Sequence, residues 1–260
     1  MSIVESDSKS NEAREPEPVK TPDSAVGRRI EFLRSVRYVF EHPEWFKGLL
    51  LLAVFMLIPV LSQPMLFGYV YEVVEHRHRK LPGPYPLFDI RRFAAYVTRG
   101  IWCYLLVNLM ATLLIPVFQF TLQGGMFASM AIIQSNRDVG PLIVGIAAPL
   151  VLTGLFVFLL AVSIVLEPLF LRAGLTQDFA LTFNFRWAVD FVRRMWLETL
   201  LINLFCWLAS AVLTLVGCAL FCVGALVAAA LMSLASGHLT WQLYELYLAR
   251  GGEPIPLKTP

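Results

Sequence analysis

The sequence predicts an all-α, polytopic integral membrane helical bundle. Of its 260 residues, 57% are hydrophobic and 15% are charged, with a mean hydropathy of +0.66, whereas soluble domains contain about 25% charged residues. Four blocks carry no Asp, Glu, Lys or Arg: residues 48–71, 100–136, 139–166 and 199–244. A helix needs about 20 apolar residues to cross a hydrocarbon core about 30 Å thick. The last block, with 46 residues, is therefore long enough for two crossings.

The N-terminal region divides into two parts. Residues 1–27 are polar, rich in Ser, Glu, Lys and Pro, and predict a disordered tail, because they cannot bury enough apolar surface to offset the entropy of ordering. Acidic residues and the lack of an apolar core argue against a signal peptide. Residues 28–46 alternate arginines with apolar residues at helical spacing. They predict a basic amphipathic helix lying on an anionic leaflet, as a topological anchor rather than a specific lipid site.

Residues 47–76 predict a helical hairpin, either a tilted short crossing or a re-entrant wedge. The bend is expected at Ser62-Gln63-Pro64, since Pro64 lacks an N–H and disfavours helix at the residue before it. A single crossing would instead place two strongly basic segments on opposite sides of the membrane. The hairpin keeps both on one side.

The remaining spans are expected at about 100–122, 141–166, 197–217 and 220–240, within a transmembrane domain over 47–250 and before a C-terminal tail at 251–260. This topology places 20 of the 21 Lys and Arg residues on one side, with only Arg137 on the other. The positive-inside rule then predicts a multi-pass protein of the bacterial cytoplasmic (inner) membrane with both termini in the cytoplasm. The aromatic stripe of residues 175–196 predicts a second interfacial helix; the alternatives are that the stripe packs against the bundle or binds a partner.

No motif for catalysis or cofactor binding is present in the sequence. It contains no H-E-x-x-H, G-x-S-x-G, Walker loop or C-x-x-C. His76 and His78 have no acidic or Cys ligand nearby, and the four cysteines lie in apolar segments, where packing is the better interpretation. We therefore expect no enzyme activity, metal or cofactor, and no nucleic-acid partner.

Two sets of residues are candidates for function. The first set consists of polar residues at membrane depth: Asn108, Glu167 and Asn203. Glu167 is expected to pair with a base such as Arg172. The second set consists of small residues four apart, which let helices approach closely. This predicted helix-packing face is Ala225, Ala229, Ser233 and Gly237.

Three stretches together resemble the bacterial membrane-protein family catalogued as domain of unknown function 4013. They are "PEWFKGLLLLAVFMLIPVL" with "FGYVYEVVEHR" and "YPLFD", then "EPLFLRAGLTQDFALTFNF", and finally "GHLTWQLYELYL". The resemblance covers roughly residues 40–250. It includes a P-x-P-x-(F/W)-D turn at Pro84–Asp89 and a terminal H-x-x-x-Q-x-Y helix from His238 to Tyr244. Asn184 stands where the family has an acidic residue. The resemblance implies a fold but no activity.

The sequence therefore favours a non-enzymatic membrane scaffold or accessory subunit. Its expected partners are a bilayer with anionic headgroups and either another membrane protein or further copies of this chain. The alternative from another class is a small-solute transporter or channel component that uses Asn108, Glu167 and Asn203.

Overall fold

The computed structural model describes residues 29–58, 60–135, 137–219 and 223–258. The predicted disordered tail at 1–27 lies outside these residues. The elements are α1 (Phe32–Val39), α2 (Trp45–Phe55), α3 (Ser62–His78), the 3-10 helix η2 (Ile90–Arg92), α4 (Phe93–Ser135), α5 (Gly140–Thr176), α6 (Phe179–Thr182), α7 (Phe185–Ala219) and α8 (Val223–Ala249).

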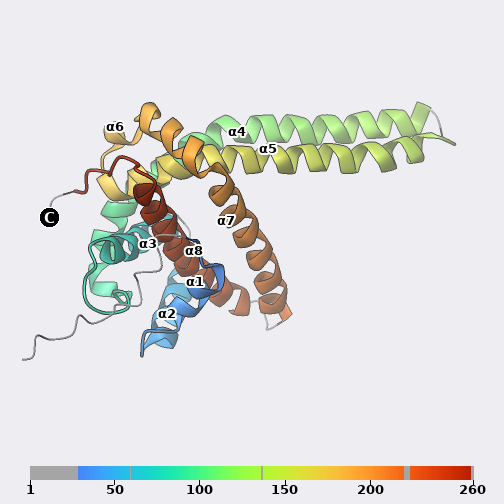
Figure 1. Ribbon diagram of the computed structural model, residues 1–260. Helices are drawn as coiled ribbons and strands as arrows, with labels where there is room; N and C mark the ends of the chain where they lie inside the picture. The colour runs from blue at the N-terminus through green and yellow to red at the C-terminus, as the bar shows by residue number, and fades with distance from the viewer. Residues whose placement is uncertain (1–28, 59, 136, 220–222, 259–260) are drawn as a thin grey trace, which may run out of the picture.

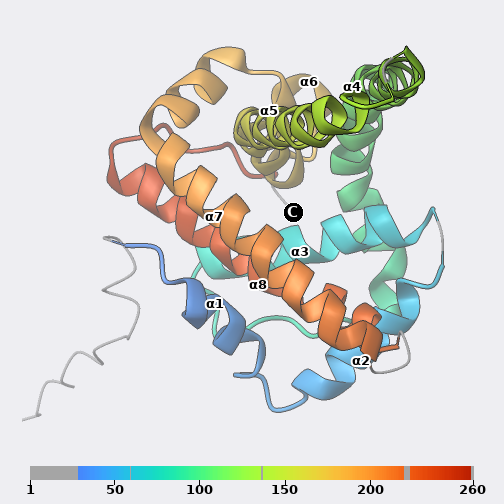
Figure 2. The same ribbon diagram turned by 90° about the vertical axis from the view of Figure 1, so that its right-hand side faces the viewer.

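Two long helical hairpins extend in different directions from a common base (Figure 1). The α4–α5 hairpin projects well beyond the rest of the molecule. We call its outer part the arm and define it as residues 107–135 and 140–166, where Gly140 is the one buried position among those described. The other hairpin, α7–α8, belongs to a compact body, in which α1, α2 and α3 pack around α8 (Figure 2).

Four helical segments are long and apolar enough to cross a membrane: Ile90–Ser135, Gly140–Thr176, Phe185–Ala219 and Val223–Ala249. This confirms the predicted fold class, and the chain is a multi-pass membrane protein. The helices are longer than the predicted spans. The 43 residues of α4 extend about 65 Å at 1.5 Å per residue, about twice the hydrocarbon thickness.

The N-terminal hairpin is present, but its predicted bend is misplaced. Helix α2 ends at Phe55 and α3 already begins at Ser62, so the break between the two helices comes before the predicted bend. Ser62-Gln63-Pro64 forms the first turn of α3 instead. A proline fits there because an N–H in the first turn has no intrahelical acceptor anyway.

The two predicted interfacial helices also differ from their expected extents. Within residues 28–46, helix α1 covers only eight residues, Phe32–Val39. Residues 175–196 do not form one separate helix. Helix α5 ends at Thr176, the short α6 follows, and 185–196 is the first part of the long α7. Asp178 divides the segment, because its Oδ1 accepts hydrogen bonds from the N–H groups of Ala180 and Leu181 and so begins a new helix.

The body has two apolar clusters, one along each half of α8. The first surrounds its C-terminal half and joins the start of α7 to the end of α5, with Phe191, Leu171 and Tyr247 fully buried. The second surrounds its N-terminal half and joins α1, α2, α3 and the start of α4, with Leu52 and Tyr69 at its centre. Both clusters depend on α8, which therefore forms the core of the body.

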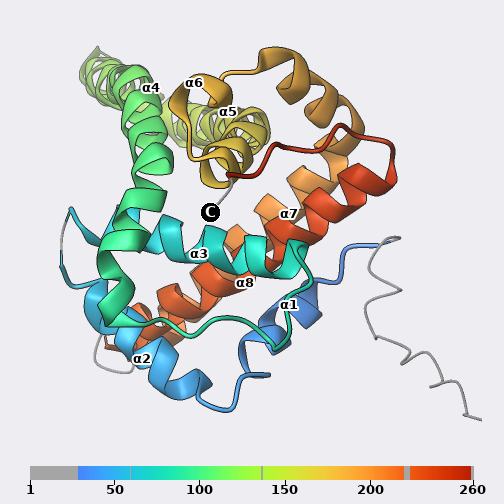
Figure 3. The ribbon, with the colours of Figure 1, turned by 90° about the vertical axis from the view of Figure 1, so that its left-hand side faces the viewer.

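Helices α3 and α4 cross at very short distance (Figure 3). A Cβ added to Gly68 would lie 1.9 Å from the carbonyl oxygen of Tyr96, and one added to Gly100 would lie 1.8 Å from that of Pro64. These obstacles are backbone atoms, so no side-chain rotation relieves them. Only glycine at both positions permits the crossing.

We therefore predict that Gly68→Ala lowers the free energy of unfolding by at least about 2 kcal/mol, because the backbones of α3 and α4 must separate. Thermal unfolding of the purified protein in mild detergent measures the effect. Gly124→Ala is the matched control, since a Cβ there meets no atom within 4 Å. Equal melting temperatures for the two variants would contradict the close crossing.

Candidate functional site

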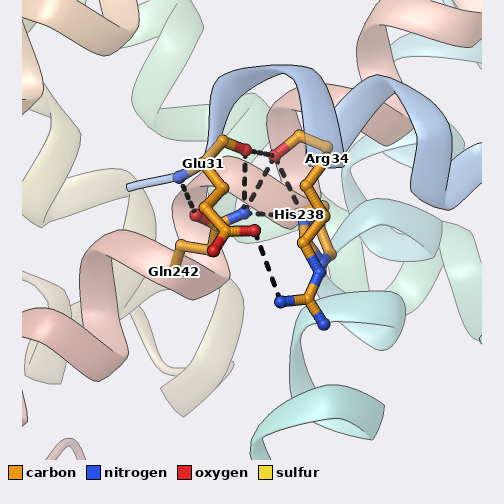
Figure 4. A network of polar contacts seen from close by, with 5 residues as sticks. Glu31, Arg34, His238 and Gln242 are labelled. Atoms are coloured by element: carbon orange, nitrogen blue, oxygen red, sulfur yellow. Dashed lines mark hydrogen bonds and ion pairs between the residues drawn. The ribbon is translucent and has the colours of Figure 1, made fainter. Parts of the chain in front are cut away.

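A buried polar network joins α1 to α8 (Figure 4). The backbone N–H of Glu31 donates to Oε1 of Gln242 at 2.7 Å, and Nε2 of Gln242 donates to Oγ of Ser35 at 3.0 Å. Nδ1 of His238 lies 3.0 Å from both Ser35 Oγ and Gln242 Nε2. Ser35, His238 and Gln242 are each at most 2% exposed. The network satisfies polar groups that would otherwise be costly to bury.

The geometry fixes the tautomer of His238. Because the Gln242 amide nitrogen can only donate, Nδ1 of His238 accepts, and the ring proton resides on Nε2. Nε2 is buried and has no hydrogen-bond partner among the described residues. The imidazole stacks on the Tyr38 ring with 4.2 Å between centroids. The Ser35 hydroxyl beside Nδ1 of His238 is fully buried, so the arrangement resembles a structural core more than a reactive site.

Tyrosines extend this network to the loop between α3 and η2. Tyr38 donates from its hydroxyl to the Pro84 carbonyl at 2.5 Å, and Tyr85 donates to the Val39 carbonyl at 2.7 Å. Burial, followed by the nearby Glu41 carboxylate, raises the pKa of Tyr85 to about 12. Its hydroxyl therefore keeps its proton and donates at neutral pH.

Charged residues at the base, where α3 and α8 end and α4 and α7 begin, mostly form ion pairs. Arg92 pairs with Glu72 at 2.6 Å, and Glu75 pairs with both Arg79 and Arg99. Three further contacts each pair a basic side chain with an acidic one. His78 of α3 pairs with Glu245 of α8, Arg194 pairs with Asp190 within α7, and Arg250 after α8 pairs with Glu198 of α7. Within the described ranges, no group of three His, Cys, Asp or Glu side chains could hold a metal ion.

The three predicted polar positions lie on three different helices, and no hydrogen bond between their described atoms joins any two of them. Asn108 is exposed on α4 and donates to the Tyr104 carbonyl of its own helix at 2.8 Å. Glu167 on α5 accepts from Thr240 of α8 at 3.2 Å. The Nδ2 atom of Asn203 on α7 is buried, with no partner in the described part of the chain.

The expected pairing of Glu167 with Arg172 is wrong. Nε of Arg172 donates to the Leu181 carbonyl at 3.0 Å, and its guanidinium lies 5.1 Å from the centroid of the Trp187 ring. Arg172 thus holds α6 against the start of α7, because it lies one turn further along α5 on a different side from Glu167.

The predicted small-residue face of α8 is used at its two ends. A Cβ on Gly237 would lie 2.8 Å from Val70 of α3, and the backbone of Ala225 packs against Gly217 of α7. Ala229 and Ser233 instead line a hollow of about 350 Å³ between α7 and α8. The face therefore packs within the chain at its ends and stays open in the middle.

Comparison with protein families identifies the chain. The family described as "Protein of unknown function (DUF4013)" matches residues 51–222, which is more than half of the sequence. The chain belongs to this family. Comparisons with curated proteins and with solved structures gave no significant match. The start of the resemblance at His42–Trp45 and its terminal motif at His238–Tyr244 lie outside the matched residues.

The structure gives physical roles to residues of the DUF4013 resemblance. In the terminal motif, His238 and Gln242 bind α1, and the Tyr244 hydroxyl accepts from the Ile255 N–H at 2.8 Å. In the turn, Pro86 accepts from the Tyr69 hydroxyl at 3.0 Å. The contacts of His238 and Gln242 with α1 could not be predicted from the sequence, because the spacing of a motif gives no sign of a partner such as Ser35, 207 residues from Gln242.

Asn184 stands where the resemblance implies an acidic residue, and the structure gives this side chain a capping role. Its Oδ1 accepts from the Trp187 N–H at 3.1 Å and so caps the start of α7. An Asp would make the same bond, because both residues offer a side-chain oxygen at the N-cap.

We predict that Gln242→Leu releases α1 from α8. It leaves the Glu31 N–H and the groups around His238 without partners, at a cost of about 1–3 kcal/mol. Hydrogen exchange measured by mass spectrometry should show faster exchange over residues 29–39. Ser236→Ala is the control, since that hydroxyl bonds only to the Ser233 carbonyl of its own helix. Unchanged exchange in Gln242→Leu would contradict the network.

We also predict that Asn184→Asp leaves the melting temperature unchanged, whereas Asn184→Ala lowers the free energy of unfolding by about 1 kcal/mol. The reason is that Asp preserves the N-cap acceptor and Ala removes it. Thermal unfolding of the three proteins side by side tests this. A stability loss in Asn184→Asp equal to that in Asn184→Ala would refute the capping role.

Proposed function

We propose that this protein is a non-enzymatic accessory subunit or scaffold that binds a transmembrane helix of another membrane protein through its arm. The proposal places it in the cytoplasmic membrane of a bacterium with both termini in the cytoplasm. The base, which carries most of the basic residues, would then face the cytoplasm, in agreement with the positive-inside rule.

The arm is not covered by the body. The most apolar window of α5 has none of its residues buried, and large side chains such as Phe120 and Leu150 are 80% and 68% exposed. Lipid can cover such apolar side chains without any protein partner. The apolar surface alone therefore says only that the arm lies in the membrane.

The polar residues of the arm carry the proposal. Gln119 and Gln123 are exposed on α4, and neither amide makes a hydrogen bond to a described residue. They lie four residues apart and so on one face of the helix. Both fall inside the charge-free block 100–136. Amides exposed to hydrocarbon are costly, and hydrogen bonds to a neighbouring helix remove that cost.

The glycines of the arm give independent support. A Cβ on Gly124, Gly145 or Gly154 would meet no atom within 4 Å, whereas Gly68, Gly100 and Gly237 in the body all lie against neighbouring elements. Glycine weakens a helix unless close packing requires it. In this chain the body uses such glycines to bring helices together, and a partner helix would use those of the arm in the same way.

A small-solute pathway is the second function considered from the sequence. It needs polar residues that line one route, and Asn108 faces outward while Glu167 and Asn203 are partly buried on other helices. No specific observation favours this function, so the accessory role is preferred.

We predict that replacing both amides, in Gln119→Leu with Gln123→Leu, abolishes binding of the partner protein, because its helix loses the hydrogen bonds that the arm offers. The measurement is the native mass of the tagged protein purified from its own membranes in mild detergent. Wild type should carry a second protein at fixed stoichiometry. Gln63→Leu, which changes an exposed glutamine of α3, is the matched control and should retain it.

A single-chain mass for all three proteins would overturn the proposal. A mass equal to a multiple of the chain would replace the accessory role by self-assembly. Retention of the partner by the double variant would exclude the arm as the binding surface.

A further inference from the structure

An apolar hollow of about 390 Å³ lies between α5 and α7. Val165 and Leu169 line it from α5, and Phe185, Val189 and Val192 line it from α7. Of the residues described in its lining, Arg193 is the one that carries a charge. The hollow thus combines a surface suited to hydrocarbon with a single cationic group.

The hollow lies where apolar and basic sequence meet. Val165 is near the end of the charge-free block 139–166, and Arg193 lies just before the block 199–244. Phe185 and Trp196, at 65% and 52% exposure, are aromatic residues of the kind enriched at headgroup depth. The hollow therefore reaches from the hydrocarbon to the interfacial layer.

Arg193 has a second cation about two turns away, at the edge of a separate polar hollow that Asp190 and Glu253 also line. Arg186 precedes it by seven residues, which is about two turns of α7, so both project from the same side of the helix. Both are exposed, and neither forms an ion pair with a described residue. They differ in this from Arg92, Arg194 and Arg250, whose carboxylate partners are given above.

The acidic residue nearest in sequence to the two arginines, Asp190, already accepts hydrogen bonds from other side chains. Asp190 lies between the two arginines, but its Oδ1 accepts from Arg194 at 2.9 Å and its Oδ2 accepts from the Tyr247 hydroxyl at 3.0 Å. Asp190 therefore makes no hydrogen bond or ion pair with Arg186 or Arg193, and only a longer-range attraction links it to Arg193. Two guanidinium groups with free donors, beside a groove for hydrocarbon, suit a phosphate attached to an acyl chain.

We propose that the α5–α7 hollow binds one anionic phospholipid, with an acyl chain against Val165 and Val189 and the phosphate bound by Arg193 and Arg186. The site is separate from the arm and does not depend on the accessory function. It is also distinct from a general attraction of the basic base to an anionic leaflet, because it requires the apolar lining as well as the charge.

The test uses the full chain, purified and delipidated in mild detergent, with native mass spectrometry after addition of phosphatidylglycerol or phosphatidylcholine. Wild type should retain phosphatidylglycerol in preference to phosphatidylcholine. In Arg186→Gln with Arg193→Gln this binding should weaken about 30-fold. Arg37→Gln with Arg91→Gln is the control, because it removes the same charge from exposed residues elsewhere.

A second variant tests the apolar half of the site. Val189→Trp fills the hollow without changing the charge, so it should also release phosphatidylglycerol, and it decides the matter if the arginine variant does not fold. Glycerol phosphate, which has no acyl chain, should not compete. Equal binding of the two lipids, unchanged binding in Val189→Trp, or competition by glycerol phosphate would each overturn the proposal.

Discussion

The arrangement of the body depends on the buried polar contact between α1 and α8. Once Gln242 and His238 bind the start of α1, Tyr38 faces the loop that follows α3, and the hydroxyls of Tyr38 and Tyr85 join helix and loop in both directions. A slip of α1 along α8 would leave several buried donors and acceptors unpaired. An apolar contact would tolerate such a slip, so the polar network sets the register that the surrounding apolar clusters then stabilise.

The body and the arm use the same residue types in opposite ways. In the body, glycine permits close backbone contact, as at Gly68 and Gly100, and the buried side chains of Ser35 and Gln242 find partners within the chain. In the arm, Gly124, Gly145 and Gly154 border open space, and the amides of Gln119 and Gln123 are exposed. The contrast separates a part of the molecule that is complete by itself from a part whose surface suits another helix. It is the physical basis of the proposal that the arm binds a helix of another protein.

The sequence predicted features governed by composition along the chain and missed those governed by distant contacts. The charge-free blocks predicted where the four long helices of the described chain lie, because a helix that crosses hydrocarbon lacks charged residues whichever helices it packs against. The bend of the N-terminal hairpin was misplaced since Pro64 fits the first turn of a helix as well as a break. The aromatic spacing of residues 175–196 predicted one helix. In the structure, the side-chain oxygens of Asp178 and Asn184 each cap the start of a new helix there.

The candidate site was less predictable for a similar reason. Gln242 was recognised only as part of a motif, because its partner Ser35 lies 207 residues earlier. Asn108 and Asn203 lie within charge-free blocks and Glu167 directly follows one, but their neighbours depend on how the helices are rotated about their axes. Hydropathy gives the depth of a residue and not the direction in which it points.

The position of α8 at the end of the chain has a consequence for how the protein is made. Helices α1, α2 and α3 are synthesised before α8, yet α8 covers their buried faces. The following tail closes the base as well, where the Lys258 N–H donates to the Leu175 carbonyl. Until then the early helices must wait in the membrane with polar groups such as Ser35 unsatisfied. The order of biosynthesis therefore separates the synthesis of the early helices from the completion of their buried contacts.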